Sequence, residues 1–563
     1  MDNYTIADNF SLLAKLMDIH GDNSFKAKSY SSAAYTIEKL NIQLNNIDEQ
    51  KIFSLQGIGE SVGKKIIEQL HTGQLTSLNE YLQKTPQGII EMLLHIKGLG
   101  PKKIATIWKD LEIETIGELL YACNENRLTL YKGFGEKTQN NIRESIEFYL
   151  SNIGNYLYEQ IELYATAIDE KIKTVFKKYS FYITGAFKRQ LETIDKLEWV
   201  TNCLAVDLKE FFLQNEYKLI TETNHYISFK GKENIELNFY CNNAEQLIAT
   251  LFKTSCSKEF YNEWVTQTNW NENNFYSTEE EIFSTYNIQF IPAFLREKPF
   301  TITQAKAKNK NLPTVIQPED IKAIIHSHSN WSDGSNTIEE MANECIKKGL
   351  QYLVLSDHSK AAFYAKGLTE ERIVAQHKQI EELNKKLHPF KIFKSIECDI
   401  LNDGNLDYTP AVLKTFDVII ASVHSNLKMN EEKAMMRLLK AIENPFTSIL
   451  GHMTGRLLLS RNGYPVNHKT IIDACAANNV VIELNAHPRR LDIDWRWIDY
   501  ALAKNVLISI NPDAHTIDGF NDCKYGVLVA QKAGLSKQQN LSSFSLSEFA
   551  KFVEVQQAKR NNL

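Results

Sequence analysis

The chain has 563 residues, of which 43% are hydrophobic and 23% are charged. This length exceeds what one hydrophobic core can organise, so we expect several folded domains and exclude a fibrous or disordered chain. The formal net charge of -6 excludes the broad basic surface that often marks nucleic-acid binding, so any contact with DNA has to be local.

The sequence also predicts where the protein works. No basic and apolar leader opens it, and no run of apolar residues approaches the length of a membrane span. Its eight cysteines are scattered without a C-x-x-C pair, which argues against a disulfide framework or a zinc ribbon. We therefore expect a cytoplasmic protein without a membrane partner.

Three similar glycine turns divide the first part of the chain. They are Leu55–Gly59, Ile96–Gly100 and Tyr131–Gly135, each with one apolar residue between two glycines, and a helical pattern follows each turn. One such turn is usually only a helix cap. Three of them resemble helix–hairpin–helix motifs, in which hairpin amides and the following helix N-terminus hold a DNA phosphate. The candidate DNA-binding residues are Gly57, Gly59, Gly98, Gly100, Gly133 and Gly135.

The middle of the chain changes character twice. From about residue 151 the pattern predicts a long helix through Lys178, followed by strands that include Phe181–Thr184 and Ile235–Tyr240. Residues 296–319 contain three prolines and little periodicity, so we interpret them as a linker.

Beyond this linker, short apolar runs alternate with helical stretches. The runs are Ala323–Ile325, Tyr352–Leu355, Val418–Val423, Ser448–Leu450, Val480–Leu484 and Val506–Ile510. This alternation is typical of repeated βα units in a parallel barrel or sheet. In such barrels the chemistry takes place at the carboxyl ends of the strands.

Histidines and carboxylates cluster at these predicted strand ends, and ten of the 14 histidines lie beyond residue 320. Two histidines at positions i and i+2 of a strand share one face, so His326 and His328 can reach the same metal. Imidazole and carboxylate together suit Mn²⁺, Zn²⁺ or Fe better than Mg²⁺. The sequence therefore predicts a multinuclear metal site formed by His326, His328, Asp333, His358, Glu397, His424, His452, Asp513 and His515.

The order of these residues resembles the polymerase and histidinol phosphatase (PHP) family. The resemblance runs from about Ile321 to the C-terminus, and all nine positions carry over. It implies three divalent metals in a distorted βα barrel that hydrolyses phosphoesters, with the metals activating water and neutralising phosphate charge. The departures are Ile324, in place of an aspartate, and Met453, in place of a proline.

Three further residues near these ligands are candidates for catalysis. Asp357, beside His358, is placed to orient a ligand. Arg456 and Arg461 follow His452 closely and are candidates to hold a substrate phosphate, with surface solvation as the other interpretation.

The N-terminal part resembles family X DNA polymerases, through Asn23–Tyr30 and the first two hairpins. Lys65 matches the Schiff-base lyase lysine of that family, although a solvated helix lysine is the simpler interpretation. The whole chain resembles a bacterial family X polymerase with a C-terminal PHP domain. The implied fold is multidomain α+β and α/β, with helical hairpin domains (1–80 and 81–150), a nucleotidyltransferase-like palm (151–245), a thumb (246–300), a linker (301–320) and a distorted (β/α)7 TIM-like PHP barrel (321–563).

The polymerase palm is where the resemblance breaks down. Gly185 and Ala186 stand where glycine and serine hold a triphosphate, and Thr254–Lys258 departs from the later phosphate-binding signature. The three metal-binding aspartates are replaced by Lys196, Glu198 and Glu236. An ammonium about 4 Å from a unit positive charge is repelled by roughly 4 kcal/mol at an effective dielectric of 20, and Mg²⁺ doubles this. We therefore predict an inactive palm, unless Asp195 supplies a ligand from a bulged strand.

The preferred interpretation is a DNA-repair protein whose PHP domain is a Mn²⁺-dependent 3′–5′ exonuclease or phosphoesterase. The expected partner is gapped, single-stranded or 3′-ended DNA, bound by a monomer that associates with the nucleoid. One alternative is an active gap-filling polymerase with PHP proofreading, which requires Mg²⁺ in the palm. The other is a PHP small-molecule phosphatase joined to a DNA-binding scaffold.

Overall fold

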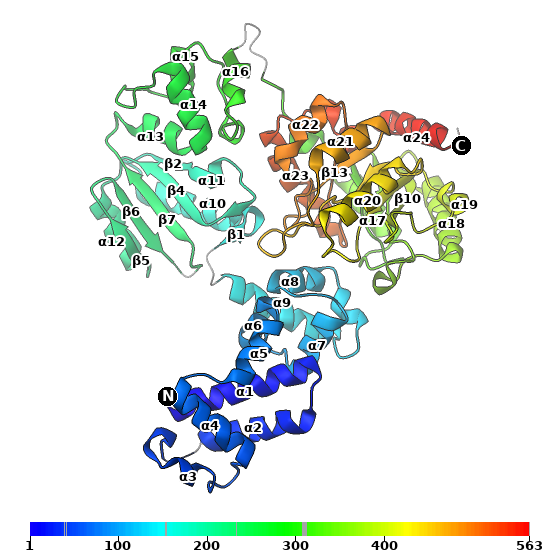
Figure 1. The fold of residues 1–563 in the computed structure, drawn as a ribbon. Helices are drawn as coiled ribbons and strands as arrows, with labels where there is room; N and C mark the ends of the chain where they lie inside the picture. Colours follow the sequence, from blue (N-terminus) through cyan, green and yellow to red (C-terminus); the bar gives the residue numbers. More distant parts are fainter. Residues whose placement is uncertain (39, 41, 152–154, 232, 307–311, 562–563) are drawn as a thin grey trace. The chain divides into compact units, whose positions relative to one another are not determined.

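The computed structural model describes residues 1–38, 40, 42–151, 155–231, 233–306 and 312–561 (Figure 1). The chain forms two compact units, one made of Met1–Asn124 and Tyr131–Tyr149, the other of Glu125–Leu130 and Leu150–Leu563. Among the helices of these described residues, none has both the length and the apolar character needed to cross a membrane.

The first unit is helical. Its helices are α1 (Asn3–His20), α2 (Ser24–Glu38), α3 (Glu49–Ile52), α4 (Glu60–Thr72), α5 (Thr76–Lys84), α6 (Gln87–His95), α7 (Pro101–Lys109), α8 (Ile116–Asn124) and most of α9 (Glu136–Ser151). Helices α4, α7 and α9 each begin directly after one of the glycine turns. The first glycine of each turn has a positive φ, between 85° and 95°, which L side chains rarely adopt. The apolar residue between the glycines is buried in all three turns.

A five-stranded sheet opens the second unit, in the order β2-β4-β7-β6-β5. Its strands are β2 (Phe181–Thr184), β4 (Lys196–Thr201), β5 (Lys218–Glu222), β6 (Tyr226–Lys230) and β7 (Glu236–Cys241). Helices α10 (Tyr158–Val175) and α12 (Ala205–Gln214) share its apolar core. Trp199 stacks on Phe239 in this core, and Phe212 stacks on Phe229.

A helical region follows this sheet, with α13 (Leu247–Thr254), α14 (Lys258–Thr268), α15 (Glu279–Thr285) and α16 (Phe300–Lys306). Phe252 and Trp264 lie at its centre. Arg296 is completely buried there, and its guanidinium donates to the Glu279 carboxylate (2.5 Å) and the Ile291 carbonyl (2.7 Å). These bonds offset part of the cost of burying the charge, although Nη2 of Arg296 has no hydrogen-bond partner among the described residues.

Two predictions for this middle region were wrong in part. The predicted helix from residue 151 begins at Tyr158, because Tyr156 and Leu157 form strand β1, which pairs with β3 (Thr193–Ile194); residues 152–154 lie outside the described part. The predicted linker 296–319 contains helix α16, whose Ile302 and Ala305 are buried. A helix of seven residues is too short to show periodicity in the sequence. Residues 307–311 of that linker also lie outside the described part.

The C-terminal region is a parallel barrel, and the predicted fold class is confirmed. Seven strands lie side by side in sequence order: β8 (Ala323–Ile325), β9 (Tyr352–Leu355), β10 (Lys391–Asp399), β11 (Val418–Ser422), β12 (Ile449–Leu450), β13 (Val481–Asn485) and β14 (Ile508–Asn511). A bridge between Ser327 and Ala514 joins the ends of the first and last strands and nearly closes the barrel. The connecting helices include α17 (Ile338–Lys347), α18 (Glu370–Lys386), α20 (Glu431–Glu443), α21 (His468–Ala477) and α23 (Cys523–Lys532), and α24 (Leu546–Asn561) ends the chain.

Candidate metal centre

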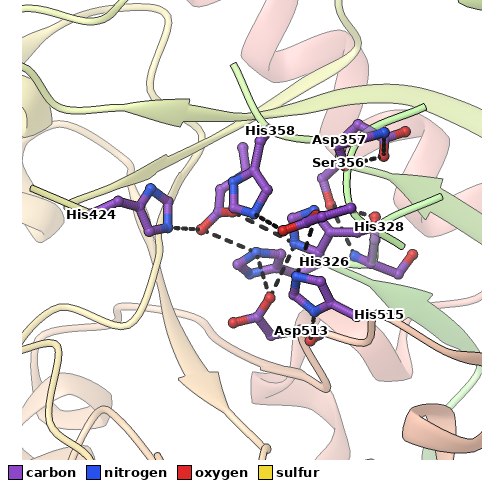
Figure 2. A network of polar contacts seen from close by, with 12 residues as sticks. His326, His328, Ser356, Asp357, His358, His424, Asp513 and His515 are labelled. Carbon is purple, nitrogen blue, oxygen red and sulfur yellow. Dashed lines mark hydrogen bonds and ion pairs between the residues drawn. The ribbon is translucent and has the colours of Figure 1, made fainter. Parts of the chain in front are cut away.

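The carboxyl ends of the barrel strands bring all nine predicted ligands together. His326 and His328 follow β8, His358 follows β9, Glu397 lies on β10, and the others follow later strands or adjoining loops. Eight of the nine are buried, and the His424 side chain is 11% exposed. Figure 2 shows the imidazoles of His326, His328, His358 and His515 gathered around the carboxylates, with His424 pointing in from the opposite side.

Glu397 lies at the centre of this cluster. Its carboxylate oxygens lie 3.0–3.6 Å from nitrogens of five imidazoles, those of His326, His328, His358, His424 and His452. Asp513 lies 3.3 Å from His326 and 3.1 Å from His328. Asp333 lies 3.6 Å from His358 and 3.5 Å from His515.

The ligand atoms fall into three groups, each compact enough to hold one metal ion. Within each group the ligand atoms lie within 4.8 Å of one another. The first group consists of His328, Asp333, His358 and His515, and the second of His326, His328, Glu397 and Asp513. The third consists of His358, Glu397 and His424. Glu397, His328 and His358 each belong to two groups, so one residue can bridge neighbouring ions. His452 lies outside these groups but contacts Glu397.

Unsatisfied polar atoms in the cluster fit bound cations. Six of the nine residues have a buried nitrogen or oxygen without a hydrogen-bond partner among the described residues: His326, His328, Asp333, His358, Glu397 and His452. Buried polar atoms are otherwise almost always paired, since an unmet one costs about 1–3 kcal/mol. Imidazole nitrogens and carboxylate oxygens are the donors that Mn²⁺, Fe and Zn²⁺ accept, so these residues suit divalent metals.

Two carboxylates outside the predicted set orient histidines of the cluster. Glu483 lies 2.6 Å from Nδ1 of His326, and Asp399 lies 2.8 Å from Nδ1 of His424. In both histidines Nε2 faces Glu397, so the carboxylate behind Nδ1 fixes the ring and its tautomer. The sequence contains a signal for each, because Glu483 interrupts an apolar strand and Asp399 is two residues from Glu397.

Electrostatic surroundings separate the histidines. Burial opposes the charged form of His424, but the carboxylates of Glu397 and Asp399 outweigh it and raise its pKa to about 10. Burial lowers the pKa of His328 to about 3, helped by the positive charges of His515 and His358. His328 is therefore neutral across the physiological range, the form in which imidazole binds a metal.

Two of the predicted ligands have a strained backbone. His326 has a φ of 63° and Asp513 a φ of 52°, in the left-handed region that residues with a Cβ rarely occupy. Such outliers cost about 1–3 kcal/mol each and persist where the surrounding structure imposes them. Here both turn a side chain into the cluster directly after a strand.

Asp357 contacts a loop that carries a ligand. Its carboxylate accepts hydrogen bonds from the backbone amide and hydroxyl of Ser329 (2.8 and 2.7 Å), the hydroxyl of Ser332 (2.5 Å) and the amide of Gln376 (2.7 Å). The loop from Ser329 to Ser332 leads directly to Asp333. Asp357 therefore anchors the loop that precedes Asp333, and its predicted role in orienting a ligand stays a prediction.

The predicted phosphate-binding arginines have structural partners. Arg456 donates to the carboxylate of Asp494 (2.6 Å) and to the carbonyls of Arg490 (2.9 Å) and Leu491. Arg461 donates to the carbonyl of Gly455 (2.9 Å). Lys65, on α4, donates to the hydroxyl of Ser77. Their proposed roles in phosphate binding and lyase chemistry stay predictions.

Among the altered palm residues, one ammonium is paired with one of the two carboxylates. Lys196 and Glu236 are paired neighbours on β4 and β7, and the Lys196 ammonium lies 3.3 Å from the Glu198 carboxylate. Glu198 also accepts a hydrogen bond from the hydroxyl of Tyr240 (2.8 Å). Its carboxylate packs against Gly185, beside Ala186, so closely that a Cβ added to Gly185 would lie 1.9 Å from it. Asp195 falls in the break between β3 and β4.

Family models match three parts of the chain. A helix-hairpin-helix domain matches residues 1–75, a SAM-like helix-hairpin-helix tandem matches residues 90–147, and a PHP domain matches residues 325–487. The parallel barrel and its buried cluster of histidines and carboxylates thus define a hydrolase domain of the PHP class, with residues suited to divalent metals.

Relatives extend this likeness to the full length. The chain is 31% identical over 571 residues to the DNA polymerase/3'-5' exonuclease PolX of Bacillus subtilis (strain 168), an alignment that covers 96% of this chain and 97% of the relative. It is 25% identical to a probable phosphatase of Thermoanaerobacter sp. (strain X514), over 40% of this chain and 91% of that protein. The chain belongs to the bacterial family X DNA polymerases with a C-terminal PHP domain.

The Asp399–His424 pair generates a prediction. Asp399→Ala should weaken Mn²⁺ binding about 10–100-fold, because His424 loses the carboxylate that orients it. Isothermal titration with Mn²⁺ measures the change. Asp403→Ala, on the nearby exposed loop, is the matched control and should bind Mn²⁺ like the unaltered protein. Equal affinity of all three proteins would contradict the role of Asp399.

Proposed function

We propose that this protein is a DNA-repair exonuclease, in which the PHP barrel removes nucleotides from 3′ ends with Mn²⁺ as the preferred metal. The observation that carries the proposal is the cluster of nine candidate ligands, eight of them buried, six of which have a buried polar atom without a hydrogen-bond partner among the described residues. The full-length relative named as a polymerase and 3'-5' exonuclease supports DNA, rather than a small phosphate ester, as the substrate.

The residues of the cluster would have two kinds of role in hydrolysis, binding the metal ions and positioning the ligands. The nine ligands would hold up to three divalent ions, and those ions would supply an activated water and neutralise phosphate charge. Glu397 holds five imidazoles around one point, and Glu483 and Asp399 hold two of these rings from behind. Asp357 anchors the loop that carries Asp333.

The glycine hairpins would deliver the DNA. The second glycine of each turn lies directly before a helix, with open space where a Cβ would project. The backbone amides there can approach a phosphate closely, at the positive end of the helix dipole. Such contacts read no bases, so binding should be independent of sequence.

In our proposal the palm is a scaffold without polymerase activity. Lys196 occupies a position where a Mg²⁺ ligand is required, and its charge is already paired with Glu198. Lys188 and Arg189, which follow the altered triphosphate loop, are engaged with Glu279 (2.7 Å) and Glu297 (2.7 Å). Few charges are left to bind a nucleotide.

Nuclease activity tests the main proposal. Purified protein with Mn²⁺ should shorten gapped or single-stranded DNA from its 3′ end, and His326→Ala or Asp513→Ala should lower the rate at least ~100-fold by removing a ligand of one of the three groups. Gel electrophoresis of 5′-labelled DNA measures this. His468→Ala, which removes a half-buried histidine outside the cluster, should retain activity. Undiminished digestion by the cluster variants would refute the assignment, and hydrolysis of small phosphate esters alone would favour a phosphatase.

The hairpins can be tested with a matched pair of glycines. Gly98 and Gly73 both have positive φ and open space around them, so alanine costs similar strain at both. Only Gly98 lies in a predicted DNA-binding turn. Gly98→Ala should weaken DNA binding about tenfold for any sequence, by displacing amides that bind phosphate. Fluorescence anisotropy measures this, and an equal effect of Gly73→Ala would assign the loss to folding.

Primer extension tests the palm. In a His326→Ala background, which prevents degradation, extension across a one-nucleotide gap should stay at the level of the blank with Mg²⁺, because Lys196 repels the metal. The triple change Lys196→Asp, Glu198→Asp and Glu236→Asp should recover at most a trace. Robust template-directed extension by the natural palm would establish the polymerase alternative, with Asp195 as the first residue to examine.

A further inference from the structure

The short segment Glu125–Leu130 belongs to the same compact unit as the barrel, although it is far from the barrel in the sequence. Residues Glu125–Leu130 group with the second unit, although the chain on either side belongs to the first. Asn126 donates a hydrogen bond to the hydroxyl of Ser335 (3.2 Å), and the Arg127 guanidinium lies 4.8 Å from the ring centre of Tyr364. These contacts place the segment beside the loops that carry Asp333 and His358.

The side chain of Glu125 reaches a predicted metal ligand. Glu125 is only 5% exposed, and its Oε2 lies against Nδ1 of His515. The same nitrogen also lies 3.1 Å from the backbone carbonyl of Asp513. The opposite nitrogen of the ring, Nε2, faces Asp333 at 3.5 Å, within the group of His328, Asp333, His358 and His515. His515 therefore has one edge toward a candidate metal position and the other edge toward Glu125.

This arrangement repeats one found twice in the same cluster. Nδ1 of His326 contacts Glu483, and Nδ1 of His424 contacts Asp399, while Nε2 of each faces the ligands. Glu125 completes the pattern for a third histidine. A buried carboxylate is costly unless it is paired, and a histidine that binds metal through Nε2 carries its proton on Nδ1, where a carboxylate can accept it.

We propose that Glu125 is a positioning residue for His515 in the metal centre. Glu125 lies inside the helix-hairpin-helix tandem matched at residues 90–147, so the part of the chain predicted to bind DNA supplies a carboxylate to the site predicted to cut it. This inference rests on the proposed metal-dependent function of the barrel. It means that residues 321–563 alone do not contain the complete site.

The test compares metal binding by full-length variants. Glu125→Ala should weaken at least one Mn²⁺ site about 10–100-fold, because Nδ1 of His515 loses its carboxylate and keeps only the weaker, neutral carbonyl of Asp513. Glu125→Gln keeps an acceptor oxygen and should stay within about threefold of the unaltered protein. Asn126→Gly removes the neighbouring contact to Ser335 at a residue with positive φ and should leave Mn²⁺ affinity unchanged. Electron paramagnetic resonance of unbound Mn²⁺ gives the affinities, and bound metal per chain gives the stoichiometry.

Each result supports or overturns the role of Glu125. Unchanged Mn²⁺ binding by Glu125→Ala would overturn it. Equal losses in Glu125→Ala and Glu125→Gln would make Glu125 a direct ligand, and an equal loss in Asn126→Gly would assign the effect to packing of the segment. Digestion of 3′-ended DNA is measured separately. Protein that binds Mn²⁺ but leaves DNA intact would refute the proposed exonuclease without touching this comparison.

Discussion

The contact between one carboxylate and five imidazoles determines most of what surrounds the metal centre. Glu397 is buried on β10, and burial alone would favour its neutral form, yet the surrounding histidines hold its pKa well below the ordinary range. So many donors in one buried place suit divalent cations, because unmet polar atoms in a low dielectric are costly. The strained backbones of His326 and Asp513 turn their side chains into this cluster. The carboxylates of Glu483 and Asp399 contact the outer nitrogens of two of its imidazoles.

The five-stranded sheet also brings carboxylates together, but there they lie beside an ammonium instead of imidazoles. Two carboxylates remain near the positions of the lost aspartates, but Lys196 neutralises Glu198 from within the protein. A divalent ion entering there would have to displace the Lys196 ammonium from Glu198 as well as shed its own water. In the barrel the carboxylates face imidazoles, whose neutral form has a lone pair that suits a metal, whereas a lysine ammonium offers no lone pair.

The sequence predicted the barrel strands well where they are uniformly apolar. Ala323–Ile325 and Tyr352–Leu355 coincide with β8 and β9, since a parallel strand covered on both faces is an apolar run. Strand β10 was missed because lysine, serine, glutamate and aspartate interrupt it. Glu397 and Asp399 are two of these polar residues. The residues that break the apolar pattern of the strand are therefore also residues of the candidate metal centre. Helix α16 was missed for another reason, its short length.

The sequence by itself determined the class of fold and predicted the nine candidate ligands, because these depend on residue type and local spacing. Spacing along a strand decides which face a side chain occupies, and parallel strands bring their carboxyl ends to one edge. Only the tertiary structure decided which carboxylate lies behind which histidine. Glu125 is separated from His515 by hundreds of residues, and Arg456 is engaged by loop carbonyls that no motif marks. Such pairings depend on how distant loops pack, and packing is not encoded in any local pattern.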